Sequence, residues 1–322
     1  MKVTALFICI GTLAPVFGQT GAFLESTGYS APAPVQVAPG QVTSFFFRGI
    51  GSLPDGHLRS AQASAAPLPT TLAGLSLRMA QGQQNAVAVP LFAVRQENDC
   101  DGASDPNAAC LLTTVKLQIP FEIDGEVTGA THTLAAPAQL TLAVDGQAGR
   151  AFPLQPVPDN SHVVTSCDAS WDTKYTSVCD RQAYHGDARP VTRFEPARRG
   201  ETLVVYVYGL GQGSPRVPTG DVAMGSVLEN LPGRVKASFD NFANALSSGP
   251  RFFSPAIPAS VSPITFGGLT SGQIGLYQLN IPVPQSLDLA LACGPEGPIR
   301  SNANLYISTS QGTETIALCV QL

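Results

Sequence analysis

The chain has 322 residues, of which only 13% are charged, and its formal net charge is −5 at pH 7. This balance excludes the basic surface that binding to nucleic acid or to an anionic membrane requires. Glycine (31 residues) and proline (27 residues) are abundant but scattered between short apolar runs, which is typical of a β protein with many turns.

The first element in chain order is a leader of the secretory type. An apolar stretch over residues 3–13 follows Lys2, and a small-residue pattern ends at Gly18. This arrangement predicts a signal peptide over residues 1–18. The apolar run is about half the ~20 residues of a membrane-spanning helix, and no later run approaches that length, so we expect no transmembrane segment. We therefore expect a secreted protein, extracellular or at the cell surface, with the periplasm as an alternative.

Residues 19–34 follow the leader and precede the first clear strand pattern. The segment contains alanine and proline and lies outside the internal repeat described next. Two interpretations remain open. It is a donor strand that pairs with the sheet edge of another copy, or it is a tail.

Three segments of the first half of the chain recur in the second half, in the same order and at nearly constant separation. The matched pairs are 40–51 with 200–211, 117–120 with 281–284, and 140–144 with 305–309. Such a series predicts a duplicated domain. Apolar residues alternate at period two along these segments, as in Leu140, Leu142 and Val144, and short strands between frequent turns favour an all-β sandwich. Helical spacing occurs only over residues 235–246, where we expect one helix.

Beyond the leader the chain contains six cysteines, and an even number in an exported chain indicates disulfides. Proximity along the chain favours three pairs. These are Cys100 with Cys110, Cys167 with Cys179, and Cys293 with Cys319. The alternative is a metal site, but the chain has no Cys-x-x-Cys pair and its four histidines are dispersed.

Five segments of the chain resemble the sequence pattern of a known family. They are residues 68–77, 196–201, 209–211, 217–221 and 275–284. They resemble the Solibacter-type C-terminal domain family, which recurs in uncharacterised secreted proteins of acidobacteria. The resemblance implies two tandem Ig-like β-sandwich domains, here over residues 19–166 and 167–322, and it implies no reaction. Two insertions bracketed by cysteines, at 97–110 and 167–179, depart from the family pattern.

The first insertion concentrates acidic side chains in a short loop. Its oxygen-bearing side chains are Asp99, Asp101, Asp105 and Asn107. Calcium prefers six to eight oxygen ligands, so these residues are candidate ligands for a calcium ion, the only cofactor that we consider. Their spacing does not follow the EF-hand pattern, which favours a solvated loop closed by a disulfide.

The second insertion carries aromatic residues. Trp171, the only tryptophan, and Tyr175 lie inside it, and Tyr184 follows it. Aromatic side chains on a rigid loop can stack on sugar rings or anchor a protein partner. Alternatively, Trp171 packs as a small core of its own loop.

Catalytic motifs are weak. Ser161-His162 and His185 with Asp187 are the nearest candidates, but there is no Gly-x-Ser-x-Gly motif, and His185-Gly186-Asp187 is typical of a turn. The glycines of residues 209–213 do not open a helix, so they indicate a bend and no nucleotide site.

We therefore expect a non-catalytic module for binding or adhesion, whose partner is an extracellular protein, a glycan or another copy of the chain. One alternative is a structural subunit that polymerises by strand addition. The other is an enzyme whose site the sequence does not reveal.

Overall fold

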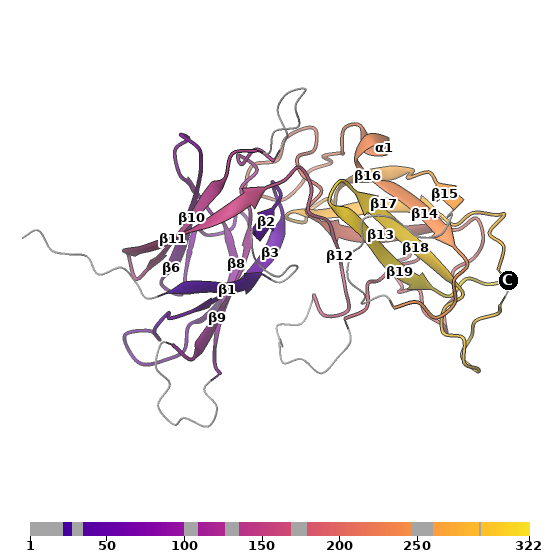
Figure 1. Cartoon of the computed structure of the whole chain (residues 1–322), viewed down its shortest axis with the longest axis horizontal. Coiled ribbons are helices and arrows are strands. Elements are labelled where there is room, and N and C mark those ends of the chain that lie inside the picture. The colour runs from indigo at the N-terminus through magenta and orange to yellow at the C-terminus, as the bar shows by residue number, and fades with distance from the viewer. Residues whose placement is uncertain are drawn as a thin grey trace, which may run out of the picture.

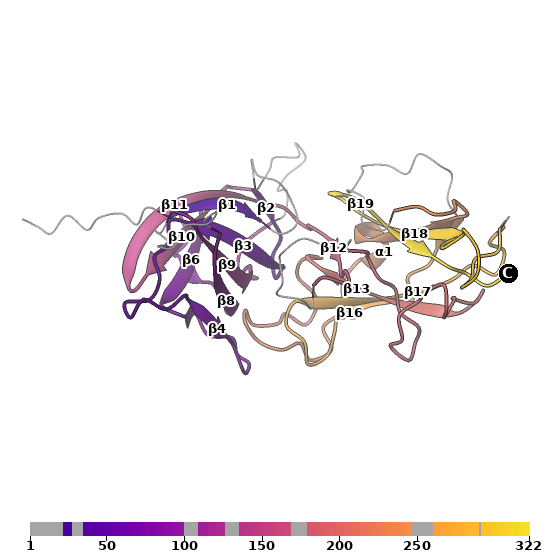
Figure 2. The same ribbon diagram turned by 90° about the horizontal axis from the view of Figure 1, so that it is seen from below.

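The computed structural model describes residues 22–27, 35–99, 109–125, 135–168, 179–246, 260–289 and 291–322. The two halves of the chain form two lobes along the long axis, with the C-terminus at the far end of the second lobe (Figures 1 and 2).

The first lobe consists of two sheets of short strands. The strands are β1 (Phe23–Thr27), β2 (Val35–Val37), β3 (Val42–Arg48), β4 (Ser60–Gln62), β5 (Thr71–Leu72), β6 (Leu75–Gln81), β7 (Val87–Ala88), β8 (Leu91–Asn98), β9 (Leu111–Gln118), β10 (Ala138–Val144) and β11 (Gln147–Pro156). One sheet has the order β1-β3-β9-β8-β4 and the other β2-β11-β10-β6-β5, with β7 on β6. Across the first sheet, β1, β3, β9 and β8 take the A, B, E and D positions of an immunoglobulin sandwich, and in the second sheet β6, β10 and β11 take C, F and G.

The second lobe repeats this topology. Its elements are β12 (His162–Val163), β13 (Thr202–Tyr208), α1 (Leu231–Arg234), β14 (Lys236–Asp240), β15 (Ser260–Ser262), β16 (Phe266–Leu269), β17 (Leu276–Pro282), β18 (Ala303–Thr309) and β19 (Gly312–Leu318). The sheet β12-β13-β17-β16 corresponds to A-B-E-D, and the sheet β15-β14-β18-β19 has C, F and G in the same positions as the first lobe. Both lobes are therefore Ig-like β-sandwiches, and the predicted all-β fold is confirmed.

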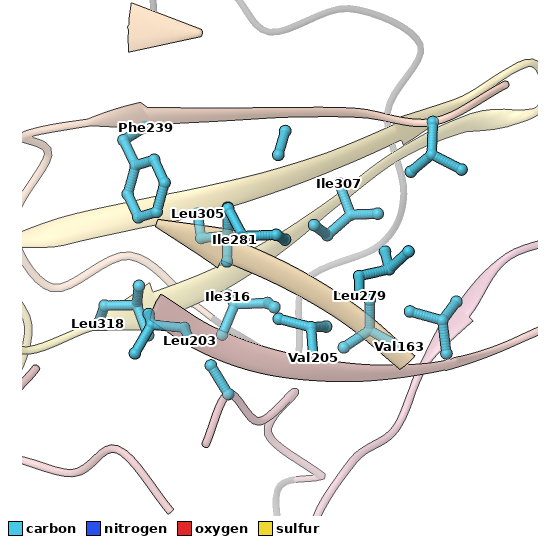
Figure 3. Packing of buried hydrophobic residues seen from close by; sticks show 14 of the residues in the cluster. Val163, Leu203, Val205, Phe239, Leu279, Ile281, Leu305, Ile307, Ile316 and Leu318 are labelled. Atoms are coloured by element: carbon cyan, nitrogen blue, oxygen red, sulfur yellow. The ribbon is translucent and has the colours of Figure 1, made fainter. Parts of the chain in front are cut away.

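Period-two alternation gives each sandwich its own core. In the second lobe Leu203 and Val205 of β13 face Leu305 and Ile307 of β18 across the sandwich (Figure 3). In the first lobe Phe45 and its buried neighbours form the corresponding core. Burial of such side chains contributes roughly 1.5–3 kcal/mol each, so each sandwich has the means to fold around a core of its own.

The matched sequence segments occupy equivalent strands with equivalent pairing. The corresponding pairs are Val42↔Gln118 with Thr202↔Pro282, and Val144↔Gln147 with Thr309↔Gly312. Val42↔Gln118 and Thr202↔Pro282 join the B and E strands of their lobes. Val144↔Gln147 and Thr309↔Gly312 close the F–G hairpins. The internal repeat is therefore a repeat of structure as well as of sequence.

The segment at residues 19–34 is neither a free donor strand nor a tail where the structure describes it. Phe23–Thr27 is β1, which pairs antiparallel with β3 of the same chain, and Ala22 is buried. β1 is the counterpart of β12, because Phe23 opposes Arg48 as His162 opposes Tyr208. The strand is too short for sequence alternation to reveal it. Residues 19–21 and 28–34 lie outside the described part.

The predicted helix over residues 235–246 is wrong. Lys236–Asp240 is the strand β14, and the only helix among the described residues is the single turn α1 that precedes it. Ala237 and Phe239 point into the core, whereas Phe242 is 57% exposed. Strand pairing with β18 overrides the helical spacing of the apolar residues. Within the described residues, no helix is long and apolar enough to cross a bilayer.

The second sandwich begins before the predicted boundary at Ser166. β12 starts at His162 and pairs with β13, and Val163 belongs to the second core. Disulfides join Cys167 to Cys179 and Cys293 to Cys319, which confirms two of the three favoured pairs. Cys110 is also disulfide-bonded, and Cys100, its predicted partner, lies outside the described residues, as do residues 1–18.

The two sandwiches meet at one end of the first, which we call the junction pole (residues 38–41 and 118–122). A loop of the second sandwich docks there: the Gly220 amide donates to Gln118 Oε1 at 2.7 Å, and Thr219 Oγ1 accepts from the Phe121 amide at 2.9 Å. Phe121 also packs against the core of the second sandwich. Because these contacts involve buried polar groups and a core contact, we expect a fixed angle between the lobes.

Candidate functional site

The outer face of the sheet β12-β13-β17-β16 carries a group of tyrosines, which we call the tyrosine face (Tyr184, Tyr206 and Tyr208). Alternation along β13 points Leu203, Val205 and Val207 into the core and leaves Tyr206 and Tyr208 on the opposite side, half-buried. The backbone of Tyr184 exchanges two 2.8 Å hydrogen bonds with Val204, which brings its ring to 5.5 Å from that of Tyr206 in a T-shaped contact.

Carboxamide side chains accompany the tyrosines. The Tyr184 hydroxyl donates to Gln182 Oε1 at 2.7 Å. On the neighbouring strand Gln278 lies opposite Tyr206 and donates through Nε2 to Asn280 Oδ1 at 2.8 Å. Rings and planar amides on one face offer stacking surfaces together with paired donors and acceptors, the chemistry that a sugar or a polar peptide needs.

A charged cluster borders this face on the side of the first sandwich. His162 Nε2 lies 3.0 Å and 3.1 Å from the two oxygens of Asp168, and Thr165 donates to Asp168 through its amide and its hydroxyl. Burial acts to raise the pKa of Asp168, but His162 and Thr165 outweigh it and hold that pKa below its usual range. Asp168 is therefore an anion fixed within a polar shell.

The pKa values of Tyr208 and Lys116 are shifted in this environment. Burial, helped by the negative charge of Asp168, raises the pKa of Tyr208 to about 12. Burial lowers the pKa of Lys116, which belongs to β9 of the first sandwich, while Asp168 acts in the opposite direction. Asp168 of the second sandwich thus interacts electrostatically with Lys116 of the first, at the edge of the tyrosine face.

The second cysteine-bracketed insertion starts and ends beside this cluster. The disulfide joins Cys167 to Cys179 with a Cα–Cα distance of 5.3 Å, and the flanking residues pair through a hydrogen bond from the Ser166 amide to the Asp180 carbonyl. Trp171 and Tyr175 lie outside the described residues. Of the three predicted binding residues the structure therefore places Tyr184, and it adds Tyr206 and Tyr208, which the sequence showed only as strand residues.

The acidic loop is described at its ends only. Asp99 accepts a hydrogen bond from Arg48 Nη2 at 2.5 Å, and its amide donates to the Cys110 carbonyl. Asp101, Asp105 and Asn107 lie outside the described residues. No group of three His, Cys, Asp or Glu side chains suited to a metal occurs in the part of the chain that the structure describes, and the calcium site stays a prediction.

The weak catalytic candidates have structural partners. His185 Nδ1 lies 2.6 Å from Glu201 Oε1, and the segment from His185 to Arg189 forms the expected turn. The bend at residues 209–213 is tied by Arg234, which donates to the carbonyls of Leu210 and Gln212. At Gly209 (φ +78°) a Cβ would lie 2.3 Å from the Asn160 carbonyl oxygen, so the glycine permits the close approach of these two backbone segments. These residues shape the backbone.

Comparison with known proteins gives no family. No family model and no curated protein matches the chain, so the resemblance to the Solibacter-type family stays a prediction. One similar solved structure is FdeC, a broadly conserved adhesin of Escherichia coli, with a TM-score of 0.22 and 10% sequence identity. The match covers 93% of this chain and 66%, just under two thirds, of the adhesin chain. A likeness this weak identifies neither a family nor a ligand.

Proposed function

We propose that this protein is a non-catalytic binding module of the cell surface or extracellular space, and that it holds a glycan on the tyrosine face. The observation that carries the proposal is the association of Tyr184, Tyr206 and Tyr208 with the carboxamides of Gln182 and Gln278 on one half-buried face. The face belongs to a rigid sheet, so little conformational entropy is lost on binding.

An extracytoplasmic location is supported by chemistry. The two disulfides that the structure describes form and persist in oxidising compartments. The predicted leader over residues 1–18 points the same way. The resemblance to secreted acidobacterial proteins fits this setting and adds no activity.

The described part of the candidate donor segment does not support the alternative of a polymer built by strand addition. Phe23–Thr27, the part of the candidate donor segment that the structure describes, already pairs with β3. At the edge strand β19, Glu314 points inward, is 1% exposed, and accepts hydrogen bonds from the Val163 amide and Arg181 Nε. An inward charge on an edge strand opposes pairing with another chain.

Glycan binding is tested with the purified full chain on a glycan array, followed by titration of the best ligand. We expect Tyr206→Ala to weaken binding about tenfold or more, as for a central aromatic contact. Phe242→Ala is the matched control, because Phe242 is an exposed aromatic residue of the same sandwich and should leave the affinity unchanged. Absence of binding to every glycan, or equal loss in both variants, would overturn the proposal.

A further inference from the structure

The end of the second sandwich that is remote from the first has the same framework as the junction pole. We call it the distal pole (residues 196–201 and 282–286). At the junction pole the Gly40 amide donates to the Ile119 carbonyl at 3.0 Å, and at the distal pole the Gly200 amide donates to the Val283 carbonyl at 2.9 Å. Figure 1 shows the C-terminus, which lies beside this pole, at the end of the molecule away from the first lobe. One pole therefore docks a loop, and its equivalent faces solvent.

The side chains of the two poles differ in kind. Ala38 of the junction pole is completely buried, whereas its counterpart Arg198 and the adjacent Arg199 are exposed. The apolar Phe121, which packs on the second core, has the exposed Gln285 as its counterpart. The distal pole thus keeps the docking framework but presents positive charge.

An open surface cavity of about 420 Å³ lies beside the distal pole, with which it shares Pro196. Its lining comes from three segments of the chain: Arg193, Phe194 and Pro196; Ala292, Cys293, Gly294 and Pro295; and Gln321 and Leu322. The Cys293–Cys319 disulfide fixes the second segment to the third. This volume lies within the range of sites for small ligands or for one or two peptide side chains.

The walls of the cavity are apolar and accessible. Phe194 is 66% exposed, Leu322 is 62% exposed, and Leu291, next to the lining residue Ala292, is 47% exposed. Large apolar side chains gathered at one place on a surface mark an interaction site more often than single ones do.

The positive charges around the cavity have no carboxylate partner within the described part of the chain. The guanidinium of Arg193 lies 4.8 Å from the centre of the Phe194 ring, a contact that holds it at the cavity wall. Two of the neighbouring carboxylates are engaged elsewhere: Glu195 binds Arg189, and Glu201 binds His185 and the Arg198 amide. A third, Glu296, follows the lining residue Pro295 and is exposed, and the described part of the chain pairs it with none of these arginines. Arg193, Arg198 and Arg199 therefore remain available to an anionic ligand, on a chain whose net charge is negative.

We propose that the distal pole binds a peptide segment of a partner protein that carries a carboxylate next to an apolar side chain. Arg193 pairs with the carboxylate, as a planar guanidinium does well, and the wall formed by Phe194 and Leu322 takes the apolar side chain. A glycan is disfavoured because, among the described residues of the lining, Arg193 and Gln321 alone have polar side chains. A second copy of the chain is disfavoured because its loop at Thr219 is already docked within its own junction.

The test uses the full chain and two fluorescein-labelled peptides. One alternates aspartate with leucine and phenylalanine, and the other has asparagine in place of every aspartate. We expect the acidic peptide to bind at low salt, to weaken as ionic strength rises, and to bind at least tenfold more tightly than the neutral peptide. Arg193→Gln should lower the affinity about tenfold or more, and Phe194→Ala should lower it severalfold.

Arg150→Gln is the matched control, because Arg150 is an exposed arginine of the first sandwich, and it should leave the affinity unchanged. Both wall residues are accessible to solvent, so the variants should fold, and unchanged thermal unfolding would verify this. Equal binding of the two peptides overturns the proposal. Binding of an acidic monosaccharide without binding of the acidic peptide also overturns it, as does concentration-dependent self-association that Arg193→Gln abolishes. Tyr206→Ala should not change peptide affinity, so this proposal and the proposed glycan function fail separately.

Discussion

The junction pole and the distal pole show one framework used with opposite surface chemistry. Both contain a glycine at positive φ just before the B strand, +72° at Gly40 and +77° at Gly200. At the junction pole apolar residues and buried amides hold the loop at Thr219. At the distal pole Arg198 and Arg199 are exposed, and Arg193 lines the largely apolar cavity beside it. A repeated sandwich can thus keep its fold while one copy of a surface becomes an internal interface and the other a site for a different partner.

The two poles are also stabilised in different ways. The junction pole is covered by the neighbouring sandwich, whereas the distal pole is closed by the Cys293–Cys319 disulfide. This difference predicts that the two sandwiches respond unequally to the same kind of change.

The largest expected effect is loss of the distal disulfide. The double substitution of Cys293→Ser and Cys319→Ser releases a bridge across 26 positions and should lower the free energy of unfolding of the second sandwich by about 3.5 kcal/mol. Hydrogen exchange should show reduced protection in β18 and β19 and little change in β3 and β9. An equal loss in both sandwiches would mean that they unfold as one unit.

The next effect compares the two pole glycines. An alanine Cβ at position 40 would lie 2.0 Å from the Phe121 ring, which is wedged between the sandwiches, and at position 200 it would lie 2.0 Å from Gln285 Nε2, which is exposed and can move. Both changes add strain at positive φ, so we expect a loss of about 3 kcal/mol for Gly40→Ala and about 1 kcal/mol for Gly200→Ala. Chemical denaturation measures both, and equal losses would contradict the comparison.

A smaller effect concerns the docked loop. Thr219 Oγ1 accepts from the Phe121 amide and donates to Glu122 Oε2. Thr219→Val removes both hydrogen bonds and should cost about 1–2 kcal/mol, with a broader distribution of interlobe angles in small-angle X-ray scattering. Thr202→Val, at an exposed position of β13, is the control. A scattering curve that stays unchanged would show that the remaining contacts fix the angle.

The smallest effect is a titration near the junction. Because the fold raises the pKa of Tyr208 to about 12 from its usual 10, the stabilisation from the neutral phenol is complete below pH 10. It is lost as pH rises through about 12. Ultraviolet absorbance of phenolate in the parent and in Tyr208→Phe isolates this step. A difference that titrates at the usual tyrosine pKa would show that Tyr208 is open to water.

Some of the site could have been predicted from the sequence and some could not. The alternation that points Val205 and Val207 inward also places Tyr206 and Tyr208 outward, so a pair of aromatic residues on the solvent side of a strand was a visible signal. The contact of Tyr184 with Tyr206 had no such signal, because it depends on pairing between a loop segment and β13. The cavity at the distal pole joins three segments that are far apart in the chain.

The all-β class and the internal repeat could be predicted from alternation and matched segments, and proximity along the chain favoured the two disulfide pairs that the structure shows. Tertiary structure decided that residues 236–240 form a strand and that Phe23–Thr27 pairs within its own sandwich. It also decided which of two equivalent poles is buried. Those outcomes depend on contacts between distant segments, where strand pairing and packing outweigh local preference. The same glycine turn is therefore an interface at Gly40 and an arginine-flanked surface at Gly200.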